Sequence, residues 1–223
     1  MTELTEILLA LILLTNIVMA GSSRLMRCIK VIALQGVLIG LLPLAVADWS
    51  SGTPHWNVIF ASAMNLAVKC VALPHLLSYV VHKVEVKREI EPFVGYSGSV
   101  AIIFVATALS FLMASHFNLT EGIVSNLAAP TAFTTICAGL FMIIARRKAI
   151  TQVIGFLMFE NGIAVFGNGI MLEYGLFVEL GILLDVFVLI FIMGIAIFHI
   201  NREFSHINAD ELNLLGDKPG EEH

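Results

Sequence analysis

Charged residues are scarce in this sequence. Asp, Glu, Lys and Arg make up only 13% of the 223 residues, whereas 58% are hydrophobic. A soluble domain typically carries about 25% charged residues. So few charges cannot cover the surface of a water-soluble globule, and a lipid bilayer is therefore the expected solvent. No segment fits a soluble catalytic domain, and the chain is expected to have no catalytic centre of its own.

Paired cysteines and a basic leader are missing as well. Cys28, Cys70 and Cys137 lie far apart and form no CxxC pair, so a zinc or iron–sulfur site is not expected. The N-terminus carries Glu3 and Glu6 in place of the basic residues that begin a signal peptide. The first apolar segment is therefore interpreted as a retained helix. No cofactor, metal or nucleic-acid partner is predicted.

Most of the sequence consists of long apolar segments. A membrane-spanning helix needs ~20 mostly apolar residues. The segments that meet this requirement are Leu4–Ala20, Ile29–Val46, Trp56–Val81, Gly95–Ser115, Leu127–Ala145, Ile150–Met171 and Leu176–Ile200. Their apolar residues are continuous and do not alternate, which favours helices over a barrel. The predicted fold is an all-α, polytopic integral membrane protein with about seven transmembrane helices.

The basic residues indicate how these helices are oriented. The loops after the second, fourth and sixth segments contain no Lys or Arg. The basic residues in the other connections and at the adjoining span ends are Arg24, Arg27, Lys30, Lys83, Lys87, Arg88, Arg146, Arg147, Lys148, Arg202 and Lys218. All of them fall on one side, which the positive-inside rule makes cytoplasmic. The sequence thus predicts an inner (cytoplasmic) membrane protein with its N-terminus outside and an acidic C-terminal tail, residues 205–223, inside.

Four ionisable residues stand out inside the predicted spans, where such residues are energetically costly and usually mark ion or proton pathways. Lys69 and His75 lie in the third segment, Glu160 in the sixth and Asp185 in the seventh. All but His75 are expected near the middle of the bilayer, at ~1.5 Å per residue. The predicted proton path is Lys69, Glu160, Asp185 and His75, with Asn65, Asn161 and Asn168 as supporting polar residues.

The residues alone leave three interpretations of these charges. Lys69 could form a static buried ion pair with Glu160 or Asp185, the groups could relay protons through water, or they could line a substrate site or a polar contact between helices. Pro74 removes a helical hydrogen bond just after Lys69 and predicts a local irregularity there. Gly155 and Gly162 share one helix face and predict the close approach of another helix.

The last three predicted helices resemble the K subunit of respiratory complex I and its antiporter relatives. The similarity is carried by Arg146-Arg147-Lys148, Val153-Ile154-Gly155-Phe156 and Glu160-Asn161. That family has a basic loop, an Ile-Gly-Leu-Glu stretch and a second acid in its last helix. Here the first family glutamate falls on Leu157, Glu160 stands one helical turn later, and Asp185 falls near the second acid. The resemblance implies that Glu160 projects from the family's face of the helix.

The whole chain resembles the hydrogenase-4 component E family in length and layout. The carrying segments are Val68-Lys69-Cys70-Val71-Ala72-Leu73-Pro74 and Glu179-Leu180-Gly181-Ile182-Leu183-Leu184-Asp185. The resemblance implies a non-redox membrane-arm subunit of a group 4 nickel-iron hydrogenase or formate hydrogenlyase-type complex, which moves protons or sodium. The implied partners are antiporter-like and quinone-site-type membrane subunits, membrane lipid and a nickel-iron hydrogenase-like cytoplasmic arm. The loops His82–Glu91 and Arg146–Lys148 would face that arm.

The predicted domain organisation follows from a weak internal repeat. Residues Val31–Leu41 align with Val153–Ile163, and both segments follow a basic loop. The units are an N-terminal three-helix unit (1–92), a spacer helix and loop (93–125), a K-subunit-like three-helix unit (126–204) and the tail (205–223). Such parallel repeats also fit a self-contained secondary transporter or cation antiporter subunit. That alternative is weakened because the third segment contains Pro74 whereas the seventh has no proline. A purely structural scaffold is the third possibility.

Overall fold

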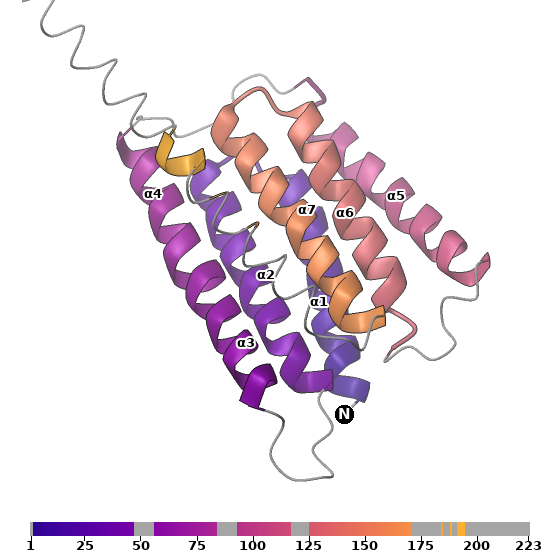
Figure 1. Ribbon diagram of the computed structural model, residues 1–223. Coiled ribbons are helices and arrows are strands. Elements are labelled where there is room, and N and C mark those ends of the chain that lie inside the picture. The colour runs from indigo at the N-terminus through magenta and orange to yellow at the C-terminus, as the bar shows by residue number, and fades with distance from the viewer. Residues whose placement is uncertain are drawn as a thin grey trace, which may run out of the picture.

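The computed structural model describes residues 2–46, 56–83, 93–116, 125–170, 184, 188 and 191–194. These residues form a bundle of helices, with no strand among them (Figure 1). Along the chain the helices are α1 (Thr2–Ala20), α2 (Leu25–Val46), α3 (Trp56–Leu66), the π-helix η1 (Ala67–Ala72), α4 (Leu73–Lys83), α5 (Tyr96–His116), α6 (Ala128–Ala145) and α7 (Ala149–Ile170).

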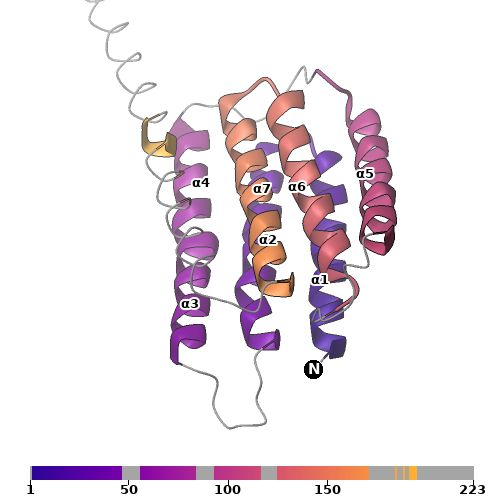
Figure 2. The same cartoon turned by 45° about the vertical axis from the view of Figure 1, so that its right-hand side comes forward.

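Six of the predicted spans are present among the described residues. Each is long and apolar enough to cross a bilayer, and α3, η1 and α4 together form one of the six (Figure 2). The helix ends lie within a few residues of the expected ones because hydrophobic length is a property of the segment itself. An all-helical polytopic architecture is therefore confirmed. Most of the seventh predicted segment, Leu176–Ile200, lies outside the described residues, although Val188 and Ile192 are buried in the core.

The basic connections lie at the same end of the bundle. Successive helices run in opposite directions, so the turn at residues 21–24, the end of α4 and the turn at 146–148 lie opposite the N-terminus (Figure 1). Arg24, Arg27 and Lys30 are exposed at that end. This arrangement matches the charge asymmetry that the sequence predicts.

Glycines allow the closest helix contacts. A Cβ atom at Gly162 would lie 2.6 Å from the backbone nitrogen of Ile136, and one at Gly155 would lie 2.9 Å from that of Ile143. Real side chains do not tolerate such distances, so α7 can approach α6 this closely only at glycine. The predicted close approach at Gly155 and Gly162 is confirmed. On α2, a Cβ atom at Gly36 would lie 2.9 Å from the Cβ atom of Lys69.

The distribution of polar and apolar side chains is the reverse of that in a soluble protein. Large apolar side chains such as Phe104, Leu112 and Ile144 are 56%, 64% and 75% exposed. Meanwhile several polar and charged side chains are buried between the helices: Asn16, Gln35, Lys69, Thr135, Glu160 and Asn161. Hydrocarbon is a suitable neighbour for the first group but cannot hydrogen-bond to the second. The buried polar side chains therefore have to find partners within the bundle.

Candidate functional site

Lys69 lies in a stretch where the helix has changed its hydrogen-bond register. Pro74 has no N–H, and in a regular α-helix its ring would clash with the carbonyl group of Cys70. The chain instead forms the π-helix η1, in which the N–H of Leu73 donates to the carbonyl oxygen of Val68, five residues earlier. Single π-helical turns occur often at functional sites. The irregularity predicted from Pro74 thus surrounds the buried lysine.

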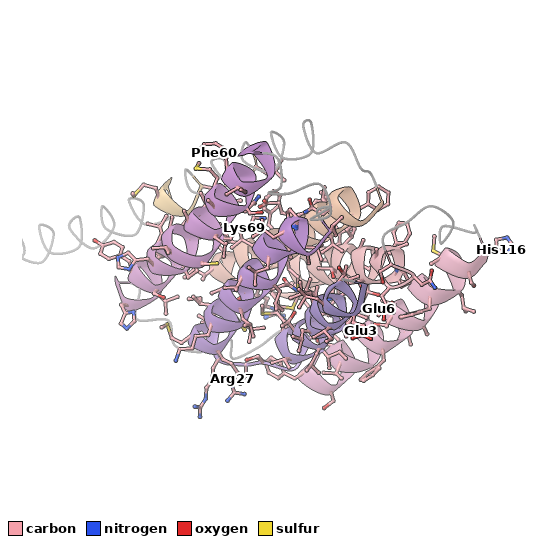
Figure 3. All side chains as sticks on the ribbon, turned by 90° about the horizontal axis from the view of Figure 1, so that it is seen from below. Glu3, Glu6, Arg27, Phe60, Lys69 and His116 are labelled. Carbon is pink, nitrogen blue, oxygen red and sulfur yellow. The ribbon has the colours of Figure 1, made fainter. Side chains whose placement is uncertain are left out.

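Lys69 bridges two residues of α7. Its Nζ donates to Oε1 of Glu160 over 2.8 Å and to Oδ1 of Asn161 over 3.0 Å. The lysine is 5% exposed and the glutamate 2%, so both charges are withdrawn from solvent. Seen along the bundle, Lys69 lies between the helices, whereas Arg27 and His116 lie at its periphery (Figure 3). The ion pair thus joins the third span to the sixth inside the bundle.

A chain of amide side chains continues from Asn161 across the bundle. Asn161 Nδ2 donates to Gln35 Oε1 over 3.0 Å, and Gln35 Nε2 donates to Asn16 Oδ1 over 2.8 Å. Gln35 Nε2 also donates to Thr15 Oγ1 over 3.0 Å, and Asn16 Nδ2 donates to Thr135 Oγ1 over 2.8 Å. The chain therefore connects η1, α7, α2, α1 and α6. Each amide presents its oxygen towards Lys69 and its nitrogen away from it.

The ion pair and the amide side chains differ in whether they can transfer a proton. An ammonium and a carboxylate 2.8 Å apart can share or exchange one proton between Nζ and Oε1. Asn and Gln neither gain nor lose protons in the ordinary pH range, so Asn161 accepts one hydrogen bond from Lys69 and Gln35 orients Asn161. Buried networks of hydrogen-bonded amides rigidify a core and make it specific.

The ion pair has features that a fully satisfied structural pair would lack. Among the described residues, the second carboxylate oxygen of Glu160, Oε2, has no hydrogen-bond partner although it is buried. A space of about 10 Å³ lies beside the lysine, comparable to the volume one water needs. Its lining residues are Ile32, Lys69, Leu73, Pro74, Leu157 and Asn161. The site thus has an unused acceptor and room for one water next to the pair.

The structure brings together only part of the predicted proton path. Lys69 and Glu160 meet, as one of the two predicted pairings, and Asn161 joins them. Asp185 lies outside the described residues. His75 is exposed, because Leu73 and Leu77 turn the opposite face of α4 to the core, and its part in a proton path stays a prediction.

The predicted supporting asparagines differ in the same way. Asn161 is buried and central to the site, whereas Asn65 and Asn168 are half-buried. Asn65 lies one turn before Lys69 on α3, and Asn168 lies two turns beyond Asn161 on α7. Neither of these two positions is as enclosed as Asn161, and their supporting role stays a prediction.

Sequence reasoning missed the neutral half of the site. Gln35, Asn16, Thr15 and Thr135 were not predicted as site residues, yet they continue the hydrogen-bonded chain. A signal was present, because Gln35 is an isolated amide deep in an apolar segment and Asn16 is another. Counting only ionisable residues inside the spans overlooked both.

Arg146 also differs from the prediction that it faces a cytoplasmic partner. The residue is 1% exposed, and its Nη2 donates to the carbonyl oxygen of Ala20 over 2.9 Å and to Ser99 Oγ over 3.4 Å. Its guanidinium lies 4.9 Å from the centre of the Tyr96 ring. Such a cation at a helix C-terminus is favourable, since the last carbonyl groups lack partners. Arg146 therefore ties α1 to α5, and only its neighbour Arg147 is exposed.

Comparison with known proteins gives one similarity over nearly the full length. The chain is 28% identical over 208 residues to "Uncharacterized protein Rv0085" of Mycobacterium tuberculosis (strain ATCC 25618 / H37Rv), covering 92% of this chain and 93% of the relative. No family model matches, and no solved structure matches. The name of the relative states no activity, so the function of this chain has to be argued from its buried residues.

Proposed function

We propose that this chain is a non-redox membrane-arm subunit of an energy-converting hydrogenase or complex I-like oxidoreductase, where it contributes to proton translocation. The observation that carries the proposal is the Lys69–Glu160 pair, with Nζ and Oε1 2.8 Å apart inside an apolar bundle. The resemblance of the sequence to the hydrogenase-4 component E family supplies the kind of complex. In this proposal the basic end of the bundle faces the cytoplasm of the cell's inner membrane.

The proton step needs only the atoms of the pair. A proton on Lys69 Nζ moves to Glu160 Oε1, which converts the ammonium and carboxylate into an amine and a carboxylic acid without changing the total charge. The pair is restored when the carboxylic acid of Glu160 releases this proton on one side and the amine of Lys69 takes up another proton from the other side, so that one proton passes through the pair in each cycle. Asn161 holds Nζ during both steps through its own 3.0 Å bond. Asp185 remains a predicted continuation of the path.

The same geometry favours protons over sodium ions. A sodium ion bound at Glu160 would have to lie beside the ammonium group of Lys69, and two cations at that distance repel strongly in a medium of low dielectric constant. A proton adds no second cation, because it resides on the amine or on the carboxylate.

A purely structural role is the main competitor. Replacing a buried ion pair by apolar residues of similar volume is often neutral or even stabilising. An ion pair that serves only stability is therefore a poor solution, and it is poorer still because Glu160 Oε2 finds no hydrogen-bond partner in the described part of the chain. These considerations support the functional interpretation.

The experiment has two stages. A tagged copy is first purified gently from native membranes, and its partners are identified by mass spectrometry. Recovery with a nickel-iron hydrogenase-like subunit and antiporter-like subunits supports the proposal, whereas recovery alone would favour a self-contained transporter. The intact complex is then assayed for proton uptake into vesicles during hydrogen turnover. We expect Glu160→Gln to abolish proton uptake and leave hydrogen turnover intact, while Glu6→Gln, at an exposed position, changes neither. Normal uptake in Glu160→Gln would refute the relay.

A further inference from the structure

An apolar groove opens at the basic end of the bundle. It has a volume of about 240 Å³ and lies between α6, α7 and two described residues of the later chain. Its lining residues are Ile143, Gln152, Val153, Phe156, Val188 and Phe191. For comparison, a cavity of ~150 Å³ lined by apolar side chains is large enough to bind benzene. The groove is therefore large enough to take a segment of a hydrocarbon chain.

The groove offers hardly any polar group to its occupant. Gln152 is the sole polar residue among those lining it, and its Nε2 is already engaged, donating over 2.9 Å to the carbonyl oxygen of Arg146. Polar ligands need hydrogen-bond partners when they leave water, and this surface supplies almost none. An acyl chain needs none, so hydrocarbon fits the groove best.

Positive charge lies directly above the groove. Gln152 follows Lys148 by one turn, a rise of ~6 Å, and Arg147 lies in the short connection after the end of α6 at Ala145. Arg147 is exposed and Lys148 half-exposed. The N-terminus of α7 begins at Ala149, beside these residues, and adds the positive end of its helix dipole. Phosphate groups bind at such helix N-termini, and basic residues between transmembrane helices bind anionic headgroups.

We propose that this groove binds an anionic phospholipid, with one acyl chain between Ile143 and Phe156 and the phosphate at Lys148 and the start of α7. The combination of an apolar slot and a cationic mouth selects against two other membrane molecules. A zwitterionic lipid carries its own cation, and a quinone has no negative charge for Lys148. The site is separate from the Lys69–Glu160 pair and does not depend on a role in proton transfer.

The test measures lipid binding directly. The chain in detergent is titrated with phosphatidylglycerol or phosphatidylcholine, and bound lipid is counted by native mass spectrometry. We expect phosphatidylglycerol to bind at least about fivefold more tightly, the effect of roughly one basic residue at an anionic headgroup. Ile143→Trp should fill the groove and abolish this site. Ile144→Trp is the matched control, because its neighbouring position is 75% exposed and lies outside the groove lining.

A second variant tests the headgroup. Lys148→Ala should reduce the preference for phosphatidylglycerol while lipid still binds, whereas Lys30→Ala, an exposed lysine at the same end, should leave it unchanged. Equal binding of the two lipids by the unaltered chain would overturn the proposal, as would wild-type lipid binding by Ile143→Trp. Co-purification of a quinone that Ile143→Trp removes, without any phosphatidylglycerol, would also overturn it. Size-exclusion chromatography of each variant checks that the bundle is folded.

Discussion

Lys69→Met is the most informative single perturbation of the buried pair. Methionine keeps the length and flexibility of the lysine stem but removes its charge and its donors. Glu160, 2% exposed, then loses the donor 2.8 Å from Oε1, and Asn161 loses the donor 3.0 Å from Oδ1. Removing one partner of a buried ion pair typically destabilises a protein by 3–5 kcal/mol, because the other charge is left uncompensated.

This magnitude translates into a clear shift in melting temperature. For a chain of this size each kcal/mol lowers Tm by ~2–4 °C, so Lys69→Met should melt roughly 6–20 °C below the unaltered protein. Thermal unfolding of the detergent-solubilised chain, followed by circular dichroism, measures the shift. Lys30→Met is the matched control: this lysine is exposed, and its replacement should change stability by less than about 0.5 kcal/mol.

The double variant Lys69→Met/Glu160→Leu separates the charge from the packing. Removing both charges leaves no uncompensated ion, so the double variant should melt well above Lys69→Met alone. The double-mutant cycle should give a coupling energy of at least about 2 kcal/mol. If Lys69→Met melts within ~2 °C of the unaltered protein, or if the two substitutions are simply additive, the pair does not have the strength that its geometry indicates.

Three further substitutions test the contacts around the site, each by the same melting assay. Gln35→Leu removes the acceptor of Asn161 Nδ2 and the donor to Asn16 Oδ1, so a loss of ~1–3 kcal/mol per unsatisfied group is expected. Unchanged stability would argue against the chain of amides. Gly162→Val places a side chain against the backbone of α6 and should cost at least ~1–3 kcal/mol, whereas Gly95→Ala, with open space around it, should be neutral. Arg146→Ala removes a charged hydrogen bond to α1 and should cost ~1.5–3 kcal/mol, more than Arg147→Ala; equal effects would contradict the buried role.

The spans were predictable because they depend on local composition. A run of apolar residues needs a bilayer wherever its neighbours lie, so the six described spans match their predicted ends closely. The pairing of Lys69 with an acid was also predictable, since a buried charge needs a compensating one. Whether that acid was Glu160 or Asp185 could not be decided, because the choice depends on how the helices pack.

Other features depended on three-dimensional packing and were missed. Asn16 and Gln35 carry no charge and hardly disturb an apolar segment, so nothing in a single sequence shows that they meet each other and Asn161. Because Arg146 lies next to a turn, the sequence predicts that it is solvated, yet in the structure it is buried and donates hydrogen bonds to α1 and α5. The sequence places His75 inside a membrane span, but its position on the helix turns its side chain away from the core. In each case the sequence alone does not show in which direction the side chain points.

The separation of Lys69 and Glu160 along the chain has a consequence for how the protein is made. The two residues are 91 positions apart. At a synthesis rate of ~5–20 residues per second, Lys69 is made about 5–18 s before its partner. A lone lysine at the centre of a spanning helix opposes insertion by ~2.5–3.5 kcal/mol. We therefore expect the third span to insert less readily than its neighbours, and to keep the ammonium group near the headgroups until α7 supplies Glu160. The last hairpin of the described bundle would then complete the insertion of an earlier span.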